Sequence, residues 1–357
     1  MGSDVWRVQE SEYPAQAGAE ERLRFLLRYA VLAPSGHNAQ PWRFRVADGR
    51  VWLYADRRPG APIQKGWRGR FSGRRGRRLP VADPEDRELT ISCGAALFYL
   101  RLAMRYFGQA ETVEALPDPH DPDLLAVVHP AGPHAPDDTD RALFGAIRRR
   151  FTHRAPFQDT PVPPALKHML QWLAEHEGAG FHCLSEPAAK EPVADVVADG
   201  DLQQGGDAAF RRELSKWVRT NLTRRGTGMP GYAFGLGLLP SLVAPGMLRW
   251  VNWGSGQARR DRQLVLQAPT LAALTTPRDG IACWLTAGQA LAAVLLRAAG
   301  DGVQAAYLNQ AVQVPELRER LRATLGSQDR PQVLLRMGYA AAHRAATPRL
   351  GVAAVVD

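Results

Sequence analysis

Residues 94–108, GAALFYLRLAMRYFG, form a run that would be apolar on nearly every side of a helix. A second run, GQALAAVLLRAAGDG, occupies residues 288–302, and one constant offset pairs glycines and leucines of the two runs. A helix without a polar face is usually buried in a core. We therefore expect two central helices, at about 89–107 and 283–299, that pack at the seam of an internally duplicated α+β protein.

Length and composition are consistent with a duplication. The chain has 357 residues, of which 45% are apolar, and this length suggests about two domains. We place these halves at residues 1–135 and 136–357. No uninterrupted apolar run approaches the roughly 18 residues that span a bilayer, and three widely spaced cysteines argue for a reducing cytosol. We expect a cytoplasmic monomer that acts as an intramolecular pseudo-dimer, with no membrane partner and no metal site.

Local patterns predict further elements around the central helices. Residues 20–32 carry a helical period of apolar side chains that ends before Pro34. Residues 42–46 and 51–54 alternate around Asp48-Gly49, which predicts a hairpin with a type I′ turn. Other predicted elements are a short helix that ends at the RRRFTHRAPF stretch, a helix at about 164–177, and strands at 123–129, 181–184 and 331–340.

Two segments lack a clear period. Residues 225–256 are rich in Gly, Pro and apolar residues, and we interpret them as a long flap. Residues 64–78, QKGWRGRFSGRRGRR, carry much of the net charge of +9. Such a charge block is typical of a solvated loop, and the alternative is a contact to phosphate on nucleic acid or on a nucleotide. Because no nucleic-acid-binding signature surrounds Trp67 and Phe71, nucleic acid is not an expected partner.

The stretch RRRFTHRAPF, residues 148–157, is a candidate phosphate site. Arg150, Thr152 and Arg154 occupy alternate positions, and in an extended segment such side chains point the same way. Two guanidiniums and a hydroxyl would then converge on a phosphate monoester. The alternative is a basic helix end that neutralises the carbonyl dipole. Ser35 and His37 lie too close in sequence to act as nucleophile and base, so a serine hydrolase is not indicated.

The stretch APSGHNAQPWRF, residues 33–44, resembles the APSxxNxQPW signature of the nitroreductase family of flavin enzymes. Together with LPVADPEDRELTISCGAAL and RRRFTHRAPF, it resembles the Acg subgroup, in which two nitroreductase-like units are fused. The resemblance covers roughly residues 20–352. It implies a nitroreductase-like α+β fold with mixed sheets flanked by helices, and it implies flavin mononucleotide (FMN) at the seam between the halves.

The resemblance also implies which residues hold the cofactor. They are Pro34, Ser35, Asn38, Arg150, Thr152, Arg154, Tyr307, Asn309, Gln310 and Arg349. The first three would lie along the isoalloxazine ring, the arginines and the threonine would hold the ribityl phosphate, and the loop at 307–310 would run beside N5 and O4. Gly36 stands where many relatives have a second serine, and Thr347 stands where a lysine is common.

Only the first half has the APSxxNxQPW turn, and only the second has the Arg/Thr/Arg triplet, so one complete site is expected. The resemblance implies an FMN-dependent oxidoreductase that takes hydride from NADH, NADPH or an organic donor and passes electrons to a second small molecule. No residue is a certain acid or base, and His37 is a candidate proton donor or substrate contact. The alternative is a protein that sequesters FMN under a closed flap without turnover.

Overall fold

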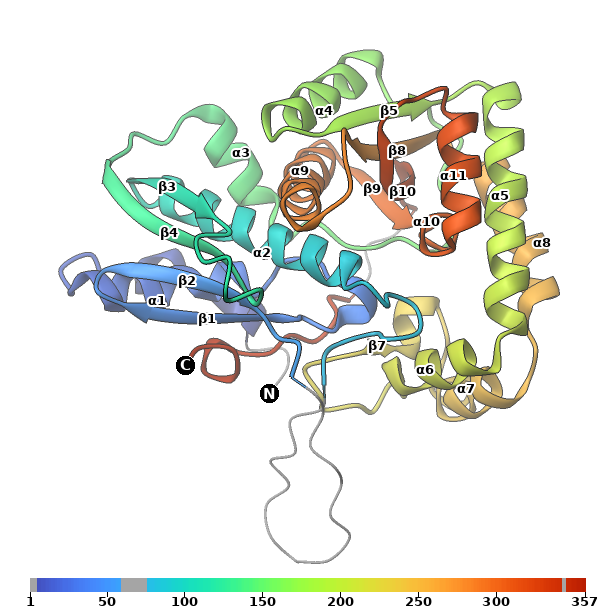
Figure 1. Cartoon of the computed structure of the whole chain (residues 1–357), viewed down its shortest axis with the longest axis horizontal. Coiled ribbons are helices and arrows are strands. Elements are labelled where there is room, and N and C mark those ends of the chain that lie inside the picture. The colour runs from blue at the N-terminus through green and yellow to red at the C-terminus, as the bar shows by residue number, and fades with distance from the viewer. Residues whose placement is uncertain (1–4, 59–75, 342–344) are drawn as a thin grey trace, which may run out of the picture.

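A computed structural model describes residues 5–58, 76–341 and 345–357. Two long helices, α2 (Arg87–Tyr106) and α9 (Ile281–Gly300), pack against each other at the centre of the molecule (Figure 1). They confirm the two predicted central helices. The offset in residue number that pairs Gly94 with Gly288 also pairs the first residues of the two helices and their last residues. Among the described helices, only α9 is long and apolar enough to cross a bilayer, and most of its apolar stretch is buried inside the protein.

The central helices approach most closely at their paired glycines. A Cβ atom placed on Gly94 would lie 2.2 Å from the carbonyl oxygen of Leu285. A Cβ atom placed on Gly288 would lie 2.0 Å from the carbonyl oxygen of Ile91. Both distances are far below van der Waals contact, so only glycine permits this approach. The contacts are also reciprocal, as a twofold axis between the two glycines requires.

Each half contains one four-stranded sheet. The first has the order β1-β2-β4-β3 and the second the order β5-β8-β10-β9. The strands of the first sheet are β1 (Trp42–Ala47), β2 (Arg50–Ala55), β3 (Gln109–Ala115) and β4 (Leu124–Pro133). Those of the second are β5 (Gly180–Leu184), β8 (Thr270–Thr276), β9 (Val303–Tyr307) and β10 (Arg330–Tyr339).

The two sheets share one topology. Counted along the chain within each half, the order across both sheets is first, second, fourth, third, and the central helix lies between the second and third strands. The helix before each sheet also has an equivalent place: α1 (Ala19–Ala30) packs on α2, and α4 (Pro164–His176) packs on α9. This repeated order supports an internal duplication, and we propose that the halves divide at about residue 135.

Parallel pairing occurs at the edges of the sheets. The ladders within both sheets are antiparallel, whereas isolated parallel bridges join Phe44 to Val356 and Thr152 to Ala305. The predicted mixed sheets are therefore confirmed, and their parallel part is confined to these edges. Because Phe44 lies in β1, the end of the chain crosses from the second half onto the sheet of the first.

The predicted hairpin is confirmed. Asp48 and Gly49 have φ values of 48° and 68°, as a type I′ turn requires. The predicted short helix before the basic triplet is α3 (Asp138–Ala146), which packs between α2 and α9. Its N-cap Asp137 accepts a hydrogen bond from the backbone N–H of Asp140 at 2.7 Å, which satisfies one of the free donors of the first turn.

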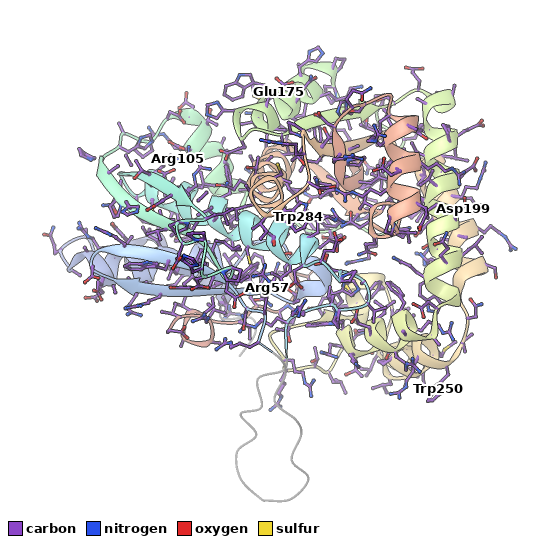
Figure 2. All side chains as sticks on the ribbon, viewed as in Figure 1. Arg57, Arg105, Glu175, Asp199, Trp250 and Trp284 are labelled. Atoms are coloured by element: carbon purple, nitrogen blue, oxygen red, sulfur yellow. The ribbon has the colours of Figure 1, made fainter. Side chains whose placement is uncertain are left out.

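A long insertion separates β5 from β8 in the second half. It contains α5 (Pro187–Gly206), α6 (Ala208–Trp217), β6 (Val218–Arg219), β7 (Met229–Pro230), α7 (Leu238–Trp250) and α8 (Gly254–Leu266). The predicted flap therefore contains a helix, α7. The sequence did not predict this helix because it lacks a polar face and contains Pro245. Trp250, at the end of α7, lies at the outer rim of the molecule (Figure 2). Two short helices, α10 (Gln310–Gln313) and α11 (Pro315–Thr324), lie between β9 and β10.

Candidate functional site

The turn between α1 and β1 has an unusual backbone. His37, Asn38 and Gln40 have φ values of 49°, 56° and 53°. Positive φ is uncommon for residues other than glycine, and such strain clusters at functional sites. Two hydroxyl groups hold the turn: Ser92 Oγ accepts from the N–H of Gly36 at 3.2 Å, and Ser35 Oγ accepts from the N–H of Gln40 at 3.0 Å. The turn is thus fastened to the central helix α2.

Asn38 joins the turn to the flap and to the C-terminal segment. Its Nδ2 donates to the carbonyl oxygens of Gly228 and Pro348, both at 2.9 Å. Its Oδ1 accepts from Arg349 at 2.7 Å. The Asn38 amide therefore links three segments far apart in sequence. Its expected contact with the flavin edge, like that of Pro34 and Ser35, stays a prediction.

The residues that follow Asn38 have contacts that fasten the turn to other parts of the chain. Gln40 Nε2 donates to the carbonyl oxygen of Gly226 at 2.7 Å, and its Oε1 accepts from the N–H of Leu350 at 2.9 Å. Trp42 is fully buried in the core of the first half. Arg77, from the end of the basic segment, donates to the carbonyl oxygens of Gln40 and Trp42, both at 2.8 Å.

Two buried arginines, Arg150 and Arg349, interact electrostatically near the turn. Arg349 is 4% exposed, its guanidinium lies 5.1 Å from the centre of the Trp6 ring, and its Nε has no hydrogen-bond partner among the residues that the structure describes. Arg150 donates from Nε to Tyr99 Oη at 3.1 Å. Burial and the charge of Arg150 lower the pKa of Arg349 to about 9. Within the described residues, neither arginine is ion-paired with a carboxylate, so the pair favours an anion between them.

Thr152 and Arg154 follow Arg150, whose backbone N–H donates to the carbonyl oxygen of Ala146 at 3.1 Å, just beyond α3. Thr152 forms the parallel bridge to Ala305, so the chain at this residue lies beside β9, the edge strand of the second sheet, and the convergence of the three side chains stays a prediction. Arg154 donates to the carbonyl oxygen of Ala233 at 3.2 Å and lies 4.8 Å from the centre of the Phe234 ring. Ala233 and Phe234 belong to the 3₁₀ turn η4 (Gly231–Phe234) of the flap. The flap therefore packs directly on Arg154, one of the predicted phosphate residues.

His37 is half-buried and interacts electrostatically with Arg154. Burial lowers its pKa to about 4, and the positive charge of Arg154 contributes to the shift. The imidazole is therefore neutral at pH 7. A neutral imidazole can still donate or accept a hydrogen bond, which suits a substrate contact better than a role as a charged proton donor.

The side chains of the predicted flavin loop after β9 contact different parts of the molecule. Burial raises the pKa of Tyr307 to about 12, so it stays a neutral hydroxyl near Arg150. Asn309 Nδ2 donates to Glu88 Oε1 at 3.0 Å. Gln310 instead reaches α5 and α8, where its Nε2 donates to Asp201 and Asp261, both at 3.3 Å. The Gln310 side chain thus faces an acidic pair and not the arginines.

Glu88 is a candidate site residue that the sequence reasoning missed. Its carboxylate, in the first turn of α2, accepts from Asn309 and, at 3.0 and 3.1 Å, from Gln313 Nε2. A Cβ atom placed on Gly36 would lie 3.6 Å from Glu88 Oε2, so the carboxylate faces the strained turn. Burial raises the pKa of Glu88 to about 7, although Arg87 opposes the shift. In the sequence, the indication for Glu88 was a single acidic residue near the start of a helix that is otherwise largely apolar.

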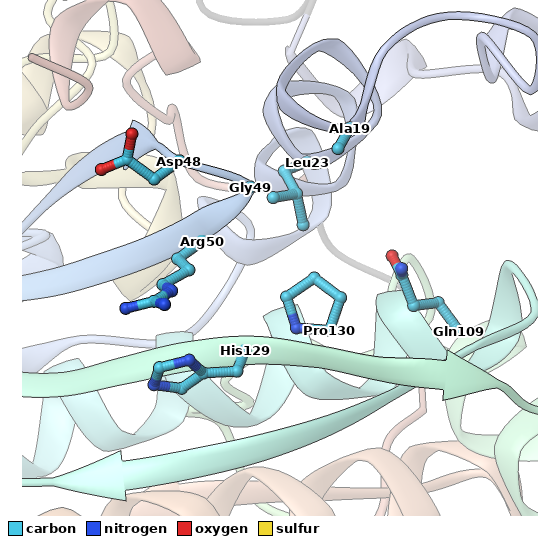
Figure 3. A pocket seen from close by; sticks show the side chains of 8 residues that line it. All are labelled: Ala19, Leu23, Asp48, Gly49, Arg50, Gln109, His129 and Pro130. Carbon is cyan, nitrogen blue, oxygen red and sulfur yellow. The ribbon is translucent and has the colours of Figure 1, made fainter.

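Other regions contribute less. A surface hollow of roughly 330 Å³ lies between the start of α1, the β1–β2 turn and β4 (Figure 3). It is lined by Ala19, Leu23, Asp48, Gly49, Arg50, Gln109, His129 and Pro130, and contains none of the predicted site residues. Most of the basic segment lies outside the described residues. At its end, Arg77 is buried and paired with Asp56, and Arg78 is paired with Asp86.

Comparison with known proteins identifies the family. No family model matches the chain. The chain is 30% identical over 350 residues to MT3217 of Mycobacterium tuberculosis (strain CDC 1551 / Oshkosh), whose name gives NAD(P)H nitroreductase as an inferred activity. The match covers 94% of this chain and 91% of that protein. The chain belongs to the nitroreductase family.

Other nitroreductases show more distant similarity. The Acg protein of the same organism, also named as an inferred NAD(P)H nitroreductase, is 27% identical over 329 residues, with 89% of each chain covered. Among solved structures, the FMN- and NADPH-dependent nitroreductase NfnB from Sphigopyxis sp. strain HMH aligns with a TM-score of 0.42 and 20% identity, over 60% of this chain and 97% of that one. NfnB from Mycobacterium smegmatis, solved with NADPH, aligns with a TM-score of 0.41 and 18% identity, over 62% of this chain and 99% of that one.

Proposed function

We propose that the protein is an FMN-dependent oxidoreductase in which hydride passes through flavin N5 between NAD(P)H, or an organic donor, and a second small molecule. Family membership supports the reaction class. The names of relatives, which give NAD(P)H nitroreductase activity, and of structural neighbours, which give FMN, support the cofactors. When bound, FMN would supply the redox chemistry, and the protein would supply binding, orientation and electrostatics.

The observation that carries the proposal is the electrostatic interaction of two buried arginines, Arg150 and Arg349, neither of which is ion-paired with a carboxylate among the described residues. Two buried guanidiniums repel each other, and an anion between them would remove that repulsion and satisfy Arg349 Nε. A phosphate monoester has the charge and the acceptor oxygens for this position. We propose that Arg150, Thr152, Arg154 and Arg349 hold the phosphate of FMN, so the residues present fit the cofactor.

The remaining groups would act around the ring. We propose that the strained turn at Pro34, Ser35 and Asn38 fixes one edge of the isoalloxazine and that the backbone at 307–310 lies along another. Glu88 faces the strained turn and is hydrogen-bonded to Asn309. A carboxyl group with a pKa of about 7 can hold or release a proton on Oε2 near neutral pH. The flap would exclude water from this space.

Loading with FMN tests the cofactor assignment. The purified protein, mixed with FMN and desalted, is expected to retain a flavin absorption spectrum. Arg150→Ala with Arg154→Ala should abolish retention while circular dichroism shows an intact fold, because the phosphate loses two cations. Arg149→Ala is the matched control, since Arg149 is exposed in the same run of arginines. Unchanged FMN affinity in the double variant would refute the phosphate assignment.

A second candidate function is sequestration of FMN without turnover. The observation that favours it is the closed flap, where Asn38 Nδ2 donates to Gly228 O and the Gly228 N–H donates to Asn38 O at 3.2 Å. Anaerobic addition of NADH or NADPH separates the two functions. Bleaching of the flavin absorbance supports the oxidoreductase, whereas yellow protein that stays oxidised with both nucleotides and with a chemically diverse set of organic donors supports sequestration.

A further inference from the structure

The outer face of α7 is apolar and exposed. Trp250 and Leu239 are 76% and 75% exposed, and Leu238, Leu242, Val243 and Met247 are each about half exposed. The helix lies at the rim of the molecule, where Trp250 points away from the body (Figure 2). Large apolar patches are rare on soluble monomers and usually mark an interaction site.

The inner face of α7 already has a partner within the chain. Ser241 is fully buried, and Ala244 and Leu248 pack against a cluster that includes Phe210 and Trp217 of α6. The helix is therefore apolar on both sides. A helix with this composition is normally covered on all sides, in a core or by lipid. Since one side is held by α6, the outer side is available for a second partner.

The charges around α7 have one sign. No Asp or Glu occurs between Glu213 and Asp261, whereas this segment carries Lys216, Arg219, Arg224, Arg225, Arg249, Arg259 and Arg260. All of these except Arg219 are exposed. Leu222, next to the arginine pair at 224–225, is also 68% exposed. Exposed cations thus flank the exposed apolar helix along the chain, a combination typical of helices that lie in a membrane interface.

We propose that α7 is a peripheral membrane-binding helix, which lies on the surface of an anionic lipid bilayer. Its outer apolar side chains would enter the boundary between headgroups and acyl chains, and the surrounding cations would pair with lipid phosphates. A second copy of the chain is a poorer occupant, because a twofold contact through this face would place like charges together. The sequence predicted no membrane partner because no apolar run is long enough to span a bilayer, and the 13 residues of α7 are also too few to span one.

Vesicle sedimentation of the full chain tests the proposal. Vesicles of phosphatidylglycerol and phosphatidylcholine in equal amounts should sediment the protein, and vesicles of phosphatidylcholine alone should bind it much less. Salt at about 1 M should weaken binding to the anionic vesicles, because it screens the cations. Failure to bind anionic vesicles at low salt, or equal binding to both vesicle types, would overturn the proposal.

Variants of the outer face locate the contact. Leu239→Ser with Trp250→Ser should weaken binding to anionic vesicles by about tenfold or more, since two large apolar side chains no longer enter the bilayer. Trp172→Ser is the matched control, because Trp172 is 53% exposed on α4, away from this segment. Because all three side chains are exposed, the variants should fold, which circular dichroism checks. Equal binding of the double variant and the control to anionic vesicles would overturn the proposal. So would light scattering that shows a dimer for the wild type and the control and a monomer for the double variant.

Quenching of tryptophan fluorescence by brominated lipid gives an independent readout that does not require comparing vesicle affinities. The difference in quenching between the wild type and Trp250→Phe reports the position of that indole alone. Quenching of the Trp250 signal by bromines placed near the headgroup boundary supports the proposal. A Trp250 signal that bound vesicles leave unquenched would contradict it.

Discussion

A Cβ atom placed on Gly94 would lie 3.0 Å from the Cα of Gly288, and one placed on Gly288 would lie 2.8 Å from the Cα of Gly94. The two central helices therefore touch backbone to backbone at equivalent positions of the two halves. The proposed FMN site depends on this seam, because its turn comes from the first half and its arginines from the second. Any change that separates α2 from α9 should affect both folding and the site.

Gly94→Ala is expected to destabilise the protein. The added methyl would overlap the Leu285 carbonyl, and overpacking of this kind typically costs about 1–3 kcal/mol. Urea unfolding measures the loss. Gly145→Ala is the control, because a Cβ on Gly145 in α3 meets no atom within 4 Å and alanine favours a helix by about 1 kcal/mol over glycine. Equal stability of the two variants would mean that the helices do not cross as described.

FMN should stabilise the protein through Arg349. At about 100 times its Kd, a ligand that binds only the native state adds about 2.7 kcal/mol to the free energy of unfolding. Arg349→Gln should remove most of this increment, because a neutral side chain no longer pairs with phosphate. Thermal unfolding with and without FMN measures the effect, and Arg320→Gln, an exposed change on α11, serves as control. An equal shift of Tm in both variants would argue against a phosphate contact at Arg349.

Glu88 should make stability depend on pH. Its pKa rises from an ordinary value of 4.5 to about 7 on folding, so the native state binds its proton more tightly than the unfolded state between these values. Stability from this group is therefore present at the acid end and is lost as pH rises from about 4.5 to about 7. Glu88→Gln cannot titrate and should flatten this part of the profile. Urea unfolding at several pH values measures the slope, and parallel profiles for wild type and variant would contradict the assignment.

Asn38→Ala should loosen the flap. The change removes the donors to Gly228 and Pro348 and the acceptor for Arg349, and each buried group left unsatisfied costs about 1–3 kcal/mol. Hydrogen exchange should accelerate at residues 226–230. Amides of α9 provide the internal control, because that helix is held by core packing. Exchange that is unchanged in the flap, or faster everywhere, would show that Asn38 is not its specific tether.

The sequence predicted much of the framework and part of the site. The central helices and the hairpin follow from local burial patterns and turn chemistry, and the structure shows them. The sharing of one phosphate by Arg150 and Arg349 came from resemblance, because nothing local relates residues so far apart, and it stays a prediction. The position of the 307–310 loop beside the flavin stays a prediction. The sequence did not indicate that the Gln310 side chain would contact Asp201 and Asp261, because those acids come from an insertion whose packing no periodicity describes.

By itself, the sequence determined two buried helices, their glycine pairing and the separation of the turn from the triplet, because apolar period, glycine position and residue order are properties of the chain. Tertiary structure alone decided what each polar group faces. It set Glu88 against the strained turn, tied Asn38 to the flap and to Arg349, and left one apolar side of α7 in solvent. These outcomes depend on which distant segments meet, and burial, charge and hydrogen bonding take effect only once they do.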